Sequence, residues 1–174
     1  MRYMLSALLV STALLTGCAG TAPKATFIAP PVKDTRVRNG DTVKVAVVAG
    51  AGVEMLESER LHLGEVISQK LGQFQAKNPA MGTPTAYDLE VTVSRFEKGN
   101  AFARAMLAGL GQIHIDARVR LLSAADQSQV SAFDLKKTFA WGGMYGATTG
   151  IEDVEPAFAE GVASALTGLE EAKK

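Results

Sequence analysis

The sequence predicts an α+β fold in which a single sheet of about four strands carries two amphipathic helices on one face. Three observations lead to this fold class. Four segments have the alternating or β-branched pattern of strands, two segments have the three-to-four spacing of helices, and their order is β-α-β-β-β-α. Each of these strands and helices is apolar on one side only, and all of the apolar sides are buried when both helices cover the same face of one sheet. The 174 residues are enough for one domain.

The first predicted strand covers residues 43–48, which are rich in valine and end at a Gly-Ala-Gly turn. The first predicted helix follows, from about residue 54 to residue 76. Its apolar residues recur every three or four positions, so they share one face. These residues are Leu56, Leu63, Ile67, Leu71 and Phe74. Asn78 and Pro79 then end the helix.

Three further strands are predicted from alternation of apolar and polar residues, at 87–94, 113–121 and about 129–140. The last two are separated by a short turn at 125–128, so we expect them to pair as an antiparallel hairpin. The final helix opens near Asp153, a favourable N-cap residue, with Pro156 in its first turn. Its predicted buried stripe is Phe158, Val162, Leu166 and Leu169.

The amino-terminal segment has the features of a signal peptide. Arg2 precedes an apolar run at 4–15, which is far shorter than a membrane span. The following Leu-Thr-Gly-Cys at 15–18 resembles the lipobox of bacterial lipoprotein precursors. That resemblance implies cleavage after residue 17 and acylation of Cys18, the single cysteine of the chain. The alternative is a plain secretory signal cut nearby, with Cys18 idle.

The lipobox resemblance also implies a location. Alanine rather than aspartate follows Cys18, which in lipoproteins favours the outer membrane, with the protein facing the periplasm. We therefore divide the chain into a signal peptide at 1–17, a lipidated cysteine with a flexible tether at 18–41, and one globular domain at 42–174. Pro23, Pro30 and Pro31 are the basis for the tether.

Composition and spacing argue against several kinds of chemistry. Lysine plus arginine and aspartate plus glutamate both number 18, so no net charge attracts nucleic acid. No cofactor is expected: Gly50 and Gly52 begin a dinucleotide-like turn, but Met55 stands where a third glycine belongs. No metal site is expected either, because the pair His62 and Glu65 has no second pair to complete it.

Two glycine-rich connections, at 97–111 and 141–150, are too apolar for ordinary solvated loops. One interpretation is close chain packing, with glycines admitting neighbouring backbone and Arg104 binding carbonyl oxygens. The sharper interpretation is a partner-binding surface beside a short helix on which Phe102, Met106 and Leu110 share a face. The predicted surface residues are Arg104, Met106, Leu107, Leu110, Trp141, Met144 and Tyr145.

The first connection also contains a recognisable pattern. Phe96, Gly99, Arg104, Gly109 and Gly111, followed by a strand, are similar to a motif in small bacterial outer-membrane lipoproteins that carry an uncharacterised domain. The resemblance extends loosely over residues 43–169. It implies location and fold, and it implies no particular activity.

The sequence predicts a binding or accessory module of the envelope and not an enzyme. Its partners would be the membrane, through Cys18, and an envelope protein or a second copy of the chain. The alternative is an envelope hydrolase that uses His114 and Asp116, which lie on the same side of one strand. Against it, no Gly-x-Ser-x-Gly motif supplies a nucleophile. A wall-linking role would need a glycan-binding signature, and we find none in the sequence.

Overall fold

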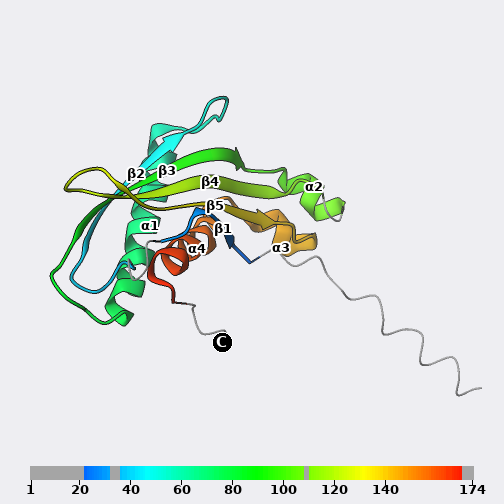
Figure 1. The fold of residues 1–174 in the computed structure, drawn as a ribbon. Coiled ribbons are helices and arrows are strands. Elements are labelled where there is room, and N and C mark those ends of the chain that lie inside the picture. The colour runs from blue at the N-terminus through cyan, green and yellow to red at the C-terminus, as the bar shows by residue number, and fades with distance from the viewer. Residues whose placement is uncertain (1–21, 32–35, 108–109, 170–174) are drawn as a thin grey trace, which may run out of the picture.

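One mixed sheet of five strands organises this protein, seen here in a computed structural model that describes residues 22–31, 36–107 and 110–169 (Figure 1). The sheet order is β1-β5-β4-β3-β2. The elements are β1 (Lys24–Ala29), β2 (Thr42–Ala49), α1 (Glu57–Lys77), β3 (Ala86–Glu97), α2 (Ala101–Met106), β4 (Ile113–Ser123), β5 (Gln129–Phe139), α3 (Gly143–Thr148) and α4 (Glu155–Thr167). The fold class is α+β, and the six elements predicted from the sequence occur in the predicted order.

The strand pairing places four strand ends at one end of the sheet. β2 and β3 are parallel and joined through α1, whereas the pairs β3–β4, β4–β5 and β5–β1 are antiparallel. The predicted hairpin of β4 and β5 is confirmed, with Ile113 opposite Phe139. Consequently the end of β3, the start of β4, the end of β5 and the start of β1 all point the same way. The short helices α2 and α3 lie at this end (Figure 1).

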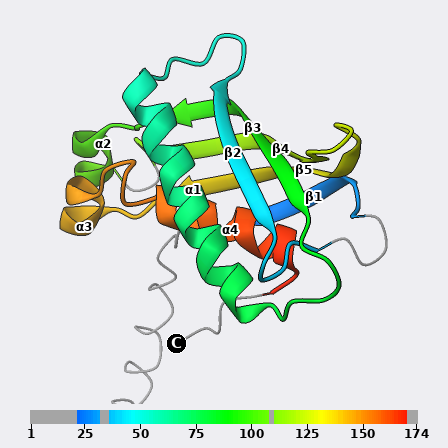
Figure 2. The same ribbon diagram turned by 90° about the vertical axis from the view of Figure 1, so that its left-hand side faces the viewer.

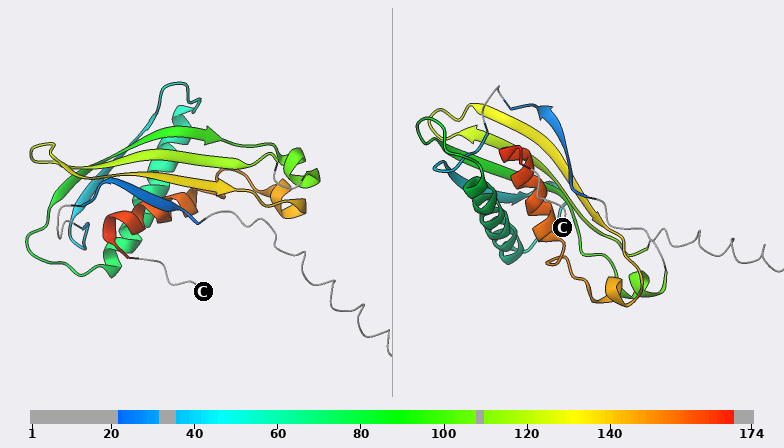
Figure 3. Two further views of the ribbon diagram at one scale, coloured as in Figure 1. Left: turned by 45° about the vertical axis from the view of Figure 1, so that its right-hand side comes forward. Right: turned by 90° about the horizontal axis from the view of Figure 1, so that it is seen from below.

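The two long helices cover one face of the sheet, as predicted (Figure 2; Figure 3). The stripe on α1 is buried at Leu63, Ile67, Leu71 and Phe74, whereas Leu56 is exposed. α4 packs beside α1 and buries its own stripe, Phe158, Val162 and Leu166. The opposite face of the sheet is polar and carries cross-strand ion pairs of Arg118 with Asp134 and of Arg120 with Glu90.

The prediction of a flexible tether at 18–41 is wrong in large part. Residues 24–29 form β1, an edge strand paired with β5, and the Phe27 ring lies 5.4 Å from the Phe133 ring. Val37 is fully buried. The prolines gave the false signal, because they flank this strand and do not interrupt it, and an edge strand needs hydrogen bonds on one side only. The sheet therefore has five strands, and the described fold begins at residue 22.

The start of the last helix also differs from the prediction. α4 begins at Glu155 with Val154 as its N-cap, and Pro156 is in the first turn. The carboxylate of Asp153 instead accepts a hydrogen bond from the amide of Gly150, so it shapes the preceding turn. Cys18 and Gly109 lie outside the described residues. Within the described ranges, no helix combines the length and the apolar character that crossing a bilayer requires.

Candidate functional site

The two glycine-rich connections together form a protrusion at one end of the sheet, which we call the tip. It comprises residues 101–107 and 110, which follow β3, and residues 141–149, which follow β5. Each connection contains one short helix, and α2 packs against α3 beyond the part of the sheet that the two long helices cover (Figure 1). α2 is capped by Asn100, whose side-chain oxygen accepts a hydrogen bond from the amide of Ala103.

The outer surface of the tip is apolar. Met144 is 89% exposed, and six more large apolar side chains are at least half or nearly half exposed. The set is Phe102, Met106, Leu107, Leu110, Trp141, Met144 and Tyr145. Every predicted surface residue except Arg104 is thus exposed here, and Phe102 joins them from the helical face predicted for it. Between Lys98 and His114 the sequence has no charged residue other than Arg104, and 138–151 has none.

Arg104 holds the tip together from within. It is 3% exposed and donates hydrogen bonds to four backbone carbonyls. Its Nε donates to the oxygen of Gly146 at 2.7 Å, and Nη2 donates to the oxygen of Thr149 at 2.8 Å. Its Nη1 donates to the oxygens of Gly111 at 2.7 Å and Lys98 at 3.4 Å. One guanidinium therefore joins both connections, and it lies under the predicted surface rather than on it.

Two glycines are required for this arrangement. Gly99 has φ of +67°, and a Cβ there would overlap both the carbonyl oxygen of Gly111 and the guanidinium of Arg104. At Gly146 a Cβ would overlap the carbonyl oxygen of Trp141. The close-packing interpretation of the glycines is therefore confirmed. It is compatible with a binding surface, because the packing lies inside the tip and the apolar side chains lie outside.

Aromatic rings fix the second half of the tip to the sheet. The rings of Trp141 and Tyr145 meet edge to face, with centroids 5.5 Å apart. The ring of Tyr145 also lies 6.0 Å from that of Phe139, the last residue of β5. Such contacts orient the side chains of α3 without burying them, so their outer edges stay available to a partner.

The residues of the predicted hydrolase alternative lie on the polar outer face of the sheet. His114 Nδ1 is 3.0 Å from the hydroxyl oxygen of Thr138 on the neighbouring strand. Burial lowers the pKa of His114. Asp116 is two residues further along β4, and its backbone oxygen accepts a hydrogen bond from Ser94. Among the described residues, no group of three or more His, Cys, Asp or Glu side chains is placed to hold a metal ion.

A buried carboxylate beside α1 is a feature that the sequence analysis missed. Glu155 is 1% exposed, and its Oε2 lies 3.3 Å from His62 Nε2. Burial raises the pKa of Glu155 to about 7, against an opposing effect of His62. We predicted Glu155 only as a first-turn acid of the last helix, because its contact with His62 lies 93 residues away in the sequence. Because of this buried carboxyl, we expect the stability of the folded protein to depend on pH.

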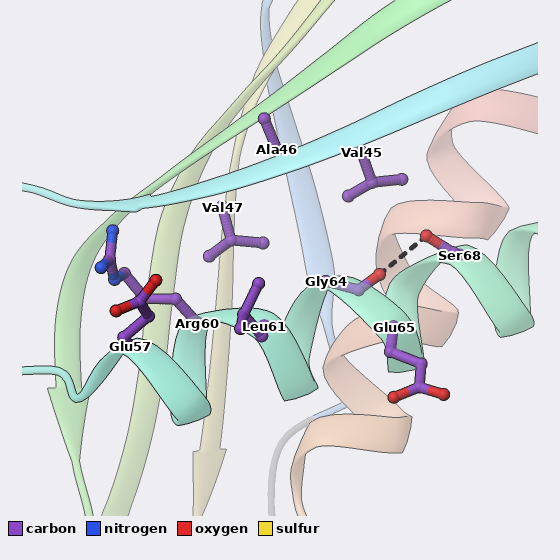
Figure 4. Close-up of a pocket in the computed structure, with 9 residues that line it drawn as sticks. All are labelled: Val45, Ala46, Val47, Glu57, Arg60, Leu61, Gly64, Glu65 and Ser68. Carbon is purple, nitrogen blue, oxygen red and sulfur yellow. Dashed lines mark hydrogen bonds between the residues drawn. The ribbon is translucent and has the colours of Figure 1, made fainter.

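A groove of about 360 Å³ lies between β2 and α1, on the opposite edge of the sheet from β1 (Figure 4). Its floor is Val45, Val47 and Gly64, and Leu61, Arg60 and Glu57 stand along its side. Leu61 and the nearby Val48 are exposed. The groove is apolar at its base and charged at one rim, and it lies beside a strand that is at the edge of the described sheet.

Residues 62–143 match the family model of a domain of unknown function, DUF4410. The matched stretch runs from within α1 to the start of α3, so it contains Arg104 and most of the tip. No curated protein matches the chain.

Solved structures with the same fold include a dodecamer of PelC from Paraburkholderia phytofirmans, which is 13% identical, with a TM-score of 0.55. A variant of that PelC, also a dodecamer, is 12% identical with a TM-score of 0.56. Each match covers 83% of this chain and 97% of the PelC chain. A "putative lipoprotein" from Caulobacter crescentus CB15 is 20% identical, over 71% of this chain and 88% of its own, with a TM-score of 0.41.

Proposed function

We propose that this chain is a lipid-anchored protein of the bacterial outer membrane that faces the periplasm and acts by binding rather than by catalysis. Cys18, in its lipobox-like context, is the proposed site of lipidation. The observation that carries the proposal is the tip, whose outer surface is apolar and whose interior is fixed by Arg104. The protein is thus proposed to be a membrane-bound accessory module with one preformed contact surface.

The tip has the properties of a contact surface on physical grounds. Contiguous exposed apolar side chains lose contact with water when a partner covers them, and large patches on a monomer are mostly interaction sites. Trp141 and Tyr145 belong to the residue types that contribute most to binding. Because Arg104 and the glycines already fix the backbone, little conformational entropy remains to be lost on contact. These features favour binding over a role in internal packing alone.

A photo-crosslinking amino acid in place of Met144 tests the contact surface in living cells. We expect irradiation to give covalent adducts at this position, because a partner covers the tip. The matched control is the same amino acid in place of Met81, which is 67% exposed and lies in the loop between α1 and β3. Equal labelling at both positions, or none at either, would show that the tip is not a contact surface.

Metabolic labelling with palmitate tests the anchor separately. We expect the wild-type chain to take up label and to fractionate with membranes, and Cys18→Ser to lose both properties. An unlabelled wild-type protein whose fractionation is unaffected by Cys18→Ser would contradict the lipid anchor, whatever the tip contacts.

Self-association is a second proposal, and the dodecamers formed by PelC, which has the same fold, support it. This chain has apolar residues at both sheet edges: Phe27 and Ile28 are exposed on β1, and Val48 and Leu61 are exposed beside β2. Edge strands offer unpaired backbone groups to a second copy. We expect native mass spectrometry of the detergent-solubilised protein to give a multiple of the chain mass. A monomer at micromolar concentration would contradict self-association.

A further inference from the structure

The position of the tip relative to Cys18 points to what covers it. We infer that the tip docks on the lipid surface that holds the Cys18 anchor, so that its apolar side chains enter the headgroup region of the bilayer. This inference rests on the proposed function and names the partner of the same surface.

Chain length keeps the anchor close to one end of the sheet. Lys24, the first residue of β1, comes six positions after Cys18, so this connection spans at most about 20 Å even when fully extended. Lys24 lies opposite Lys136 in the sheet. From Lys136, β5 reaches its end at Phe139 after three residues, about 10 Å. In the other direction, the hairpin turn at residue 128 is eight residues away, about 27 Å.

A bilayer within reach of this short connection therefore lies at the tip end of the sheet. The start of β1, the end of β5 and the start of β4 share that end, where α2 and α3 protrude beyond the long helices (Figure 3). The hairpin end of the sheet is too far from Lys24 to meet the same surface with an equally short connection. The tip is thus the part of the described fold that the anchor brings to the membrane.

The chemistry of the tip suits the headgroup region. Its exposed side chains include a tryptophan and a tyrosine, which are enriched at membrane interfaces, together with two methionines, two leucines and a phenylalanine. Its one charged residue, Arg104, is buried and bonded to carbonyls, so no charge has to leave water. Those hydrogen bonds also satisfy backbone oxygens that would otherwise be costly to place near lipid.

Charge beside the tip is consistent with lipid phosphates. Lys24 and Lys136 face each other across β1 and β5, and both are exposed. Like charges in directly opposed positions of a sheet are unfavourable, although Lys136 also lies opposite Asp116 on its other neighbour, β4. Anionic headgroups would relieve this repulsion, since lysines close to a membrane surface are attracted to anionic lipid. Lys24 is the first residue of β1 and Lys136 lies three residues before the end of β5, so both are near the tip end of the sheet.

The chain carries its own probes for a direct test. Trp141 is its single tryptophan and lies in the tip, and Cys18 is its single cysteine. The chain from Cys18 onward contains every described residue, and it can be coupled through that thiol to vesicles containing a maleimide lipid. The vesicles are phosphatidylethanolamine and phosphatidylglycerol, with acyl chains either brominated or unmodified. Bromine quenches tryptophan only on close approach, so quenching reports entry of Trp141 into lipid.

We expect coupling to shift the emission of Trp141 to shorter wavelength, to protect it from acrylamide, and to let brominated chains quench most of it. The double variant Met106→Asp/Met144→Asp should stay coupled but lose the shift and the quenching, because carboxylates hold the tip in water. Met81→Asp, a matched change at the other end of the sheet, should behave as wild type. Exchange of the glycerol headgroup for zwitterionic choline should weaken quenching, because Lys24 and Lys136 then lose the attraction of anionic lipid.

The outcomes separate this inference from the proposed function. If coupled wild-type protein keeps a water-exposed, unquenched Trp141, lipid docking is overturned, and protein adducts at position 144 would then identify a protein partner. Quenching that persists in the double aspartate variant also overturns it, because the tip would not be the inserted part. If the coupled protein docks but cells do not lipidate Cys18, the anchor proposal fails and the lipid affinity of the tip stands.

Discussion

Arg104 is a buried arginine whose guanidinium donates to backbone carbonyls, and among the described residues none of its hydrogen bonds goes to a carboxylate. The four carbonyls belong to Lys98 before α2, Gly111 after α2, Gly146 within α3 and Thr149 directly after α3. A guanidinium suits this task because its planar donors point in several fixed directions. Arg104 thereby replaces the hydrophobic core that so small a protrusion lacks.

Replacing Arg104 by methionine is therefore expected to destabilise the protein. Methionine fills a similar volume but leaves the carbonyls of Gly146 and Thr149 without the guanidinium donors and that of Gly111 with the amide of Asn100 alone, which costs about 2–4 kcal/mol in unfolding free energy. Urea denaturation measures the loss, and hydrogen exchange should show it concentrated in residues 98–107 and 141–149. Arg104→Lys should recover only part of it, because an ammonium cannot reach all the carbonyls.

The matched control for this prediction is Arg118→Met on the outer face of the sheet, where an exposed ion pair with Asp134 is removed. Solvent screens exposed pairs so that they contribute little to stability, and this variant should therefore stay close to wild type. A loss at Arg104 no larger than at Arg118 would mean that the tip is held by its aromatic contacts and not by the guanidinium.

Glu155 makes the stability of the protein depend on pH. Its pKa is about 7 in the folded protein, above the usual value near 4.5, because burial disfavours the ionised form. The groups facing it are His62, Glu59 and Glu152. A carboxyl with a raised pKa in the folded state contributes stability that is present below pH 4.5 and is lost as the pH rises through about 7.

We therefore expect Glu155→Gln to be more stable than wild type at pH 8, by on the order of 1–3 kcal/mol, and close to wild type at pH 5. Glutamine keeps the shape and a hydrogen-bonding group for His62 but carries no charge. Urea denaturation at a series of pH values measures the difference. Glu65→Gln, an exposed change on the same helix as His62, should leave the pH dependence of stability as it is. If stability depends on pH in Glu155→Gln as it does in the wild type, Glu155 is not the group responsible.

At the scale of elements, β1 is the clearest departure from expectation, and it belongs to the fold rather than to a linker. It covers the outer edge of β5, where Phe27 packs on Phe133 and Ala25 lies opposite Leu135. The free energy of unfolding of a chain that starts at residue 32 should be about 2–3 kcal/mol lower than that of a chain that starts at residue 18. This is the free energy expected when one large apolar side chain loses its cover. Equal urea midpoints for the two chains would show that β1 does not stabilise the fold, as the tether interpretation requires.

The elements that could be predicted from the sequence are those with a strong local period. β3 and β5 alternate clearly, and the stripe on α1 at Leu63, Ile67 and Leu71 fits a helix, so their type and order were predictable. β1 was hidden by its flanking prolines. The glycine pattern around Gly99 indicated close packing, and the apolar residues indicated a surface, but the partners of Arg104 lie 42 and 45 residues away. Sequence spacing alone carries no information on contacts of that range.

At the scale of the whole molecule, three surfaces lie on different sides of the fold. The tip occupies one end of the strands, and the two edges of the sheet, β1 and β2, occupy its flanks. Contacts through the edges and contacts through the tip are therefore compatible. Copies joined edge to edge in one orientation would present all their tips in the same direction, as a common membrane would require.

The geometry of such an assembly can be tested through the two edges separately. A closed ring needs a heterologous contact, in which the β1 edge of one copy meets the β2 edge of the next, whereas a two-fold dimer needs a single self-complementary edge. We expect Ile28→Lys, on β1, and Leu61→Lys, beside β2, each to reduce the oligomer to monomers in native mass spectrometry. Both side chains are exposed, so neither change should affect folding.

Mixing the two variants distinguishes the geometries, because a heterologous contact leaves one intact pair of edges between an Ile28→Lys copy and a Leu61→Lys copy. The mixture should therefore form dimers that contain one of each, although either variant alone is monomeric. If the self-association were two-fold through β1, Leu61→Lys would stay dimeric by itself and mixing would add nothing. Met81→Lys, in the loop between α1 and β3 and on neither edge strand, should assemble as wild type and thereby exclude a general effect of added charge.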